Sequence, residues 1–67
     1  MKRMQQMRLE RGWSRAELAR RAQMDASDIG RIEKGQMTPY PGQLSKIAAA
    51  LGAERDAGRV LEVIEPD

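Results

Sequence analysis

Apolar residues recur along this chain at spacings of three and four, the period of amphipathic helices. The first such stretch predicts a helix from about Lys2 to Arg11, with Met4 and Met7 on one face. Gly12 would end this helix as its C′ residue. Strand signals are weak, because β-branched residues are few, phenylalanine is absent and no alternating run of useful length occurs. The pattern therefore predicts an all-α fold.

Two further helices are predicted close together, on either side of a short turn. The run Ser14-x-x-Glu17 is a capping box, in which the serine accepts from the N3 amide and the glutamate reaches back to the helix start. An apolar stripe follows, made of Leu18, Ala19 and Ala22. After Gln23 and Met24, Asp25 is placed to cap the next helix and to favour its dipole.

The third predicted helix begins at Ala26, stops at Gly35 and has two unlike faces. At about 100° per residue, Ile29 and Ile32 fall on one side and predict its attachment to the core. The opposite side spans about 140° and carries small, polar and basic residues, namely Ala26, Ser27, Gly30, Arg31 and Lys34. The isoleucine face of this helix is predicted to pack in the core, and the opposite face is predicted to be free to bind a partner.

The remainder of the chain predicts two more helices. Pro41 suits the first turn of a fourth helix, Gly52 stops it, and its apolar face consists of Leu44, Ile47, Ala48 and Leu51. Helical spacing predicts a fifth helix over residues 54–64, with a stripe of Ala57, Val60, Leu61 and Ile64. A strand is disfavoured there because the apolar residues come in adjacent pairs, although Gly58 weakens the helix by about 1 kcal/mol.

Composition limits what this chain can do. Its 67 residues make one small domain, residues 1–67, with a single modest core. The absence of cysteine and histidine excludes disulfides, thiolate metal sites and histidine-based catalysis, so we expect no enzyme, no metal and no cofactor. No signal-peptide-like or membrane-spanning apolar run occurs, which predicts a soluble, cytoplasmic protein with no membrane partner.

Charge is divided along the chain. Residues 1–34 carry nine basic and five acidic residues, a net charge of +4, whereas residues 53–67 carry a net charge of −3. Such polarity suggests one face that approaches an anion, although charge alone also fits a merely solubilising surface.

Two short helices joined by a tight turn, the second with one face free, meet the physical requirements of a helix-turn-helix. The major groove of DNA, about 12 Å wide, admits one α-helix. Ala26 and Gly30 make the free face slim, and Ser27 and Arg31 supply donors. Arg31 could bond bidentately to guanine; a phosphate contact or a solvated arginine is the plainer alternative. Trp13 is interpreted as a packing residue rather than a base-stacking one.

Residues 4–52 resemble the phage-repressor-like helix-turn-helix family, the Cro or Xre type. The resemblance runs without gaps through Arg8, Gly12, Trp13-Ser14, Glu17-Leu18-Ala19, Ile29, Arg31-Ile32-Glu33-Lys34-Gly35, Pro39, Leu44, Lys46-Ile47-Ala48 and Ala50-Leu51-Gly52. It implies a compact bundle of five short helices, a lambda-repressor-like DNA-binding domain, with the helix-turn-helix formed by helices 2 and 3.

The resemblance also implies roles for individual residues. Arg8 and Glu33 would form a structural ion pair. The base-contacting residues would be Ala26, Ser27 and Arg31. The phosphate-contacting residues would be Arg15, Lys34, Gln36 and Thr38.

Two positions depart from the family pattern. Gln23 replaces a turn glycine whose backbone is often left-handed, which should cost about 1 kcal/mol or shift the corner. Asp28 stands where relatives have serine or threonine close to DNA. Phosphate would repel this carboxylate unless it pairs with a neighbouring arginine or accepts a hydrogen bond from cytosine N4.

Relatives that bind DNA generally do so as symmetric dimers on half-sites about 34 Å apart. The stripe on residues 54–64, with Val63 beside it, could form that dimer contact or could merely close the core. We therefore predict a sequence-specific regulator of transcription, bacterial, phage or plasmid in type, that binds double-stranded DNA at a palindromic operator as a homodimer. The alternative is an antitoxin or coactivator-like adaptor that binds a toxin or the transcription machinery, with which an acidic tail from Glu62 to Asp67 is compatible.

Overall fold

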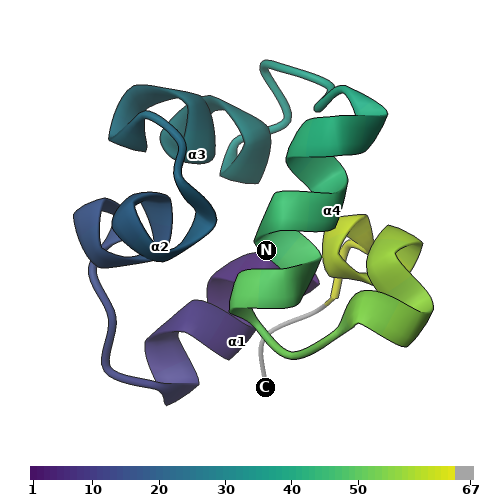
Figure 1. Cartoon of the computed structure of the whole chain (residues 1–67), viewed down its shortest axis with the longest axis horizontal. Helices are drawn as coiled ribbons and strands as arrows, with labels where there is room; N and C mark the ends of the chain where they lie inside the picture. The colour runs from purple at the N-terminus through teal and green to yellow at the C-terminus, as the bar shows by residue number, and fades with distance from the viewer. Residues whose placement is uncertain (65–67) are drawn as a thin grey trace.

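Four α-helices and one 3-10 helix follow one another along residues 1–64, the part of the chain that the computed structural model describes. They are α1 (Arg3–Glu10), α2 (Arg15–Ala22), α3 (Ala26–Glu33), α4 (Pro41–Ala50) and η1 (Glu54–Leu61). In Figure 1, α2 lies between α1 and α3, and α4 separates α2 and α3 from η1. The predicted all-α fold of five short helices is confirmed.

The core is a single cluster to which all five helices contribute. Its largest fully buried side chains are Met4, Leu18, Ile29, Ile32, Ile47, Leu51 and Val60. Burying a side chain of this size contributes about 1.5–3 kcal/mol, so the cluster is the main force that holds the short helices together. Both isoleucines of α3 belong to this cluster, which fixes the helix to the body through one face, as the sequence predicts.

The N-cap residues of α2 and α3 are those that the sequence predicts, but not all of the predicted capping hydrogen bonds form. Ser14 Oγ accepts a hydrogen bond from the Glu17 amide at 3.0 Å, as in a capping box. The Glu17 carboxylate, however, does not reach back but binds Arg20 and Arg21, because two cations one turn away attract it more strongly than an amide. Asp25 holds the N-cap position of α3, yet within the described residues its carboxylate makes no cap hydrogen bond.

The corner between α2 and α3 is made at Gln23, whose backbone is left-handed (φ 56°, ψ 48°). The Met24 amide donates to the Ala19 carbonyl at 2.8 Å and so closes the end of α2. A left-handed backbone costs a non-glycine residue roughly 1–2 kcal/mol. The turn therefore forms with glutamine in place of glycine, but at a cost in folding free energy.

The predicted amphipathic α-helix over 54–64 is wrong in its geometry. Residues Glu54–Leu61 form a 3-10 helix, interrupted at Asp56 (φ −142°, ψ 48°). The chain beyond it is extended and forms an antiparallel bridge between Val63 and Lys2. There the Arg3 amide donates to the Glu62 carbonyl at 2.7 Å, so this segment satisfies an amide at the start of α1 that has no partner within its own helix.

Two members of the apolar stripe of that segment, Val60 and Leu61, pack into the core. Val60 is fully buried, and Leu61 packs against the core cluster, whereas Val63 is 74 % exposed. Residues 65–67, the end of the predicted acidic tail, lie outside the described residues. No helix within residues 1–64 combines the length and the apolar character needed to cross a membrane.

Candidate nucleic-acid interface

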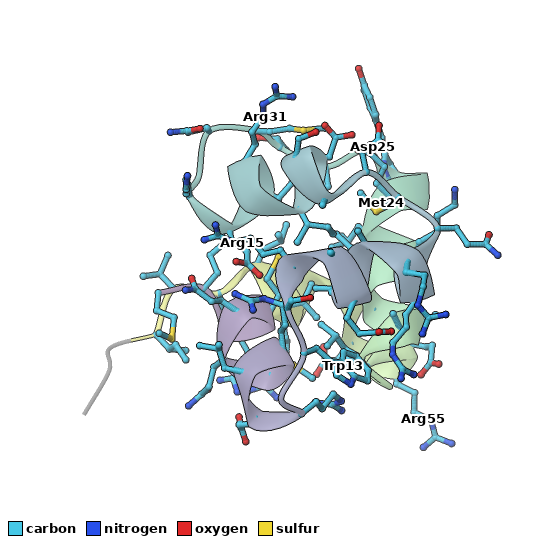
Figure 2. The ribbon with its side chains drawn as sticks, turned by 90° about the vertical axis from the view of Figure 1, so that its left-hand side faces the viewer. Trp13, Arg15, Met24, Asp25, Arg31 and Arg55 are labelled. Atoms are coloured by element: carbon cyan, nitrogen blue, oxygen red, sulfur yellow. The ribbon has the colours of Figure 1, made fainter. Side chains whose placement is uncertain are left out.

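The outward face of α3 carries the three predicted base-contacting residues. Ala26, Ser27 and Arg31 are all exposed, on the side of the helix opposite its two buried isoleucines. Figure 2 shows Arg31 pointing away from the body of the molecule, with Asp25 along the same outer edge. The arrangement leaves a narrow, polar helix surface with one long cationic side chain on it.

Gly30 does not belong to that free face, contrary to the helical-wheel prediction. It is buried, and a Cβ at this position would lie 3.8 Å from the Cδ atom of Arg15. The Arg15 side chain extends from the start of α2 toward α3 (Figure 2) and covers the glycine. A helical wheel drawn from one helix could not reveal this cover, because it comes from the neighbouring helix.

Beneath this face, one carboxylate binds two arginines. Glu33 Oε2 accepts from Arg8 Nε at 2.9 Å, and Glu33 Oε1 accepts from Arg8 Nη2 at 3.1 Å and from Arg15 Nε at 3.0 Å. The Glu33 side chain is 0 % exposed and that of Arg8 7 %, whereas that of Arg15 is 40 % exposed. The cluster therefore ties α1, α2 and α3 together and presents its excess positive charge at Arg15.

A second ion pair lies on the outer face itself. Arg31 Nη1 lies 3.4 Å from Asp28 Oδ1, one turn earlier on α3, and their side chains are 59 % and 25 % exposed. Of the two partners considered for Asp28 from the sequence, the structure places it beside the neighbouring arginine.

The predicted phosphate contacts after α3 lie on an exposed turn. Gly35 has a left-handed backbone (φ 74°), and the Gln36 amide donates to the Arg31 carbonyl at 2.8 Å. Lys34, Gln36 and Thr38 are all exposed on this turn. The turn therefore presents one cation and two neutral hydrogen-bonding side chains at the end of α3.

Trp13 lies away from this face, at the junction of α1 and α2 (Figure 2). It is half-buried against the core, with the guanidinium of Arg21 4.2 Å and that of Arg11 5.6 Å from its ring centroid. Arg11 also donates from Nη2 to the Leu51 carbonyl at 2.8 Å, near the end of α4. Sequence reasoning missed this contact, because the two residues are far apart in the chain.

Two carboxyl groups outside the outer face of α3 have shifted pKa values. A hydrogen bond from Arg20 lowers the pKa of Glu17, and one from Arg59 lowers the pKa of Glu62. Within residues 1–64, no three acidic side chains gather closely enough to hold a metal ion.

Comparison with known proteins assigns this architecture to a family. A family model described as "Helix-turn-helix domain" matches residues 2–61. The matched stretch begins one residue before α1 and ends with the last residue of η1, so it includes all five helices. No curated protein and no solved structure is significantly similar to the chain.

Proposed function

The chain belongs to the helix-turn-helix domain family, and on this premise we propose that it is a transcriptional regulator that binds specific sequences of double-stranded DNA. In this proposal α3 enters the major groove. The observation that carries it is the division of α3 into a face buried in the core and a face of small, polar and cationic residues.

Size and chemistry of the outer face suit the groove. Ala26 and Ser27 are short, so the backbone of α3 can approach base edges closely in a groove about 12 Å wide. Arg31 projects beyond them and can donate two hydrogen bonds to the O6 and N7 atoms of guanine, a contact worth about 1–3 kcal/mol of discrimination.

Residues that flank this face are assigned to the DNA backbone. Arg15 is held in place by Glu33 through its Nε atom, which leaves the rest of its guanidinium to approach a phosphate. Lys34, Gln36 and Thr38 offer a charge and neutral donors from the turn after α3. Such contacts position a protein on DNA without reading its sequence.

One recognition helix touches few base pairs, so we propose a homodimer on a palindromic operator with half-sites about 34 Å apart. Because Val60 is buried in this chain's own core, the exposed Val63 is the apolar residue of the C-terminal segment best placed to meet a second copy. We place the protein in the cytoplasm, without a cofactor or an enzymatic step.

The test is DNA binding as a function of salt. Mixed-sequence duplex DNA is titrated between about 50 and 200 mM salt, and binding should weaken with a log–log slope near −0.9 for each phosphate neutralised. Binding that is absent, or that does not change with salt, would reject DNA as the partner. It would favour the adaptor that binds a toxin or the transcription machinery.

Single substitutions then separate the two classes of contact. We expect Arg31→Ala to relax base preference and Arg15→Ala to weaken binding to every sequence by a similar factor. Arg55→Ala is the matched control, because it removes the same charge on the side of the molecule away from Arg31 (Figure 2). If Arg15→Ala and Arg31→Ala act alike across operators, the assignment of Arg31 to bases is wrong.

A further inference from the structure

The ion pair on the outer face of α3 has an unusual position for a DNA-binding surface. Asp28 and Arg31 lie one helical turn apart, with Oδ1 and Nη1 at 3.4 Å. A carboxylate in this place cancels the charge of its arginine and repels phosphate. The pair as a unit therefore adds little to the attraction between the protein and the DNA backbone.

The buried cluster of Arg8, Arg15 and Glu33, unlike this pair, has a net positive charge. Glu33 is shared by Arg8 and Arg15, so that cluster keeps one positive charge in excess, and it is displayed at the partly exposed Arg15. Arg15 and Lys34 can therefore supply the attraction to phosphates. The neutral pair of Asp28 and Arg31 suits a partner that offers both hydrogen-bond acceptors and donors, whereas a phosphate offers only acceptors.

Base edges in the major groove offer both. Guanine presents the acceptors O6 and N7, and cytosine presents the N4 amino donor. With Nη1 of Arg31 turned toward Asp28, the Nε and Nη2 atoms form the second edge of the guanidinium fork and remain for guanine. The carboxylate of Asp28 can accept from cytosine N4, and its exposed fraction of 25 % leaves it accessible from outside.

The spacing along the helix matches neighbouring base pairs. Three residues of α-helix rise about 4.5 Å, and successive base pairs are about 3.4 Å apart. Two side chains at this separation can therefore reach adjacent base pairs of the same groove.

We propose that Asp28 is a specificity-determining residue, which selects cytosine at the base pair next to the guanine bound by Arg31. This inference rests on the proposed function and sharpens it. The same carboxylate lowers affinity for random DNA, because it holds Arg31 away from phosphates and adds its own repulsion. Asp28 thus weakens binding in general and strengthens discrimination.

The experiment compares binding preferences of the whole chain and of Asp28→Asn. Each protein selects duplexes from a random library, and affinities are then measured for the selected site and for its single-base variants. We expect Asp28→Asn to lose the cytosine preference at one position by about fivefold or more and to favour adenine there, whose N6 and N7 suit an amide. The guanine preference at the neighbouring position should remain.

Binding to random DNA supplies the second measurement. Asp28→Asn should bind it more tightly than the unsubstituted chain, with a log–log salt slope steeper by up to about 0.9. Glu10→Gln is the matched control, because it removes the same charge at the end of α1, on the far side of α2 from α3. Circular dichroism should show both variants folded, since neither residue is part of the core.

The outcomes distinguish this inference from the function on which it rests. If the chain binds DNA selectively but Asp28→Asn selects the same base at every position, the role of Asp28 is overturned and the proposed function stands. Weaker binding of random DNA by Asp28→Asn would also overturn it. If the unsubstituted chain binds no DNA at any salt concentration, the proposed function itself fails.

Discussion

Two ion clusters contain acidic residues of α3, Glu33 in one and Asp28 in the other, and they differ chiefly in burial. Glu33 is fully buried between Arg8 and Arg15, whereas Asp28 and Arg31 face outward. A buried charge that loses its partner is left without solvation, but an exposed one returns to water. The same chemical pairing therefore holds the fold together in one place and remains available to a ligand in the other.

The largest effect is expected at the buried cluster. Glu33→Gln leaves Arg8 buried without a counter-charge and should lower the free energy of unfolding by roughly 3–5 kcal/mol. Because domains of this size have little stability to spare, much of the protein should be unfolded at 25 °C. Urea denaturation followed by circular dichroism measures the loss, with Glu10→Gln as the control. A loss below about 1 kcal/mol would show that the cluster is not structural.

A smaller, stabilising effect is expected at the corner that orients α3. Gln23→Gly removes the cost of a left-handed backbone at an exposed position and should raise the free energy of unfolding by about 0.5–1 kcal/mol. Gln23→Ala, which has a Cβ and the same backbone cost, should give no such gain. Thermal denaturation of the three proteins compares them directly. Equal midpoints for glycine and alanine would mean that the corner carries no strain.

Stability should hardly change when the exposed pair is broken. Arg31→Ala removes an interaction between partly exposed groups and should cost less than about 0.5 kcal/mol of unfolding free energy. The same urea titration used for Glu33 measures it. A cost comparable to that of Glu33→Gln would abolish the contrast between the two clusters and would assign Arg31 to the fold.

The smallest effect concerns a partly exposed carboxylate on α2, that of Glu17, and depends on pH. Hydrogen bonding from Arg20 lowers the pKa of Glu17 in the folded chain below its ordinary value of 4.5. Its contribution to stability is therefore present above that value and is lost as the pH falls through the lowered pKa. The difference in melting temperature between the unsubstituted chain and Glu17→Gln should shrink from about pH 6 to about pH 3. A difference that grows on acidification would contradict the direction of the shift.

The sequence predicts the helices well wherever side-chain periodicity decides the outcome. Ile29 and Ile32 are buried as their spacing requires, and the starts of α2 and α3 follow the residues placed as N-caps. Capping contacts are less predictable, because a carboxylate near a helix start can bind either the backbone amides or nearby cationic side chains. Glu17 binds arginines of its own helix instead of the backbone.

The last segment shows a different limit. Spacings of three and four residues correctly group Val60 with other apolar residues, but they do not decide whether this stripe faces the core or a second copy, nor do they distinguish an α-helix from a 3-10 helix over so short a run. The extended end of the segment depends on backbone hydrogen bonds with residues 1–3, which no pattern of side chains encodes. In the candidate interface, burial of Gly30 depends in the same way on Arg15 from another helix.

The position of Trp13 gives this protein an optical probe of its own. It is the single tryptophan of the chain, and it packs against the core from the segment between α1 and α2, with two guanidinium groups near its ring. Unfolding must separate these groups and wet the indole, so its emission should report the folded fraction. Because the ring lies away from Arg31 (Figure 2), a ligand on the outer face of α3 should leave that emission nearly unchanged. Trp13 emission should thus report the folded fraction independently of binding, so a variant that no longer binds DNA but keeps this emission has lost its binding and not its fold.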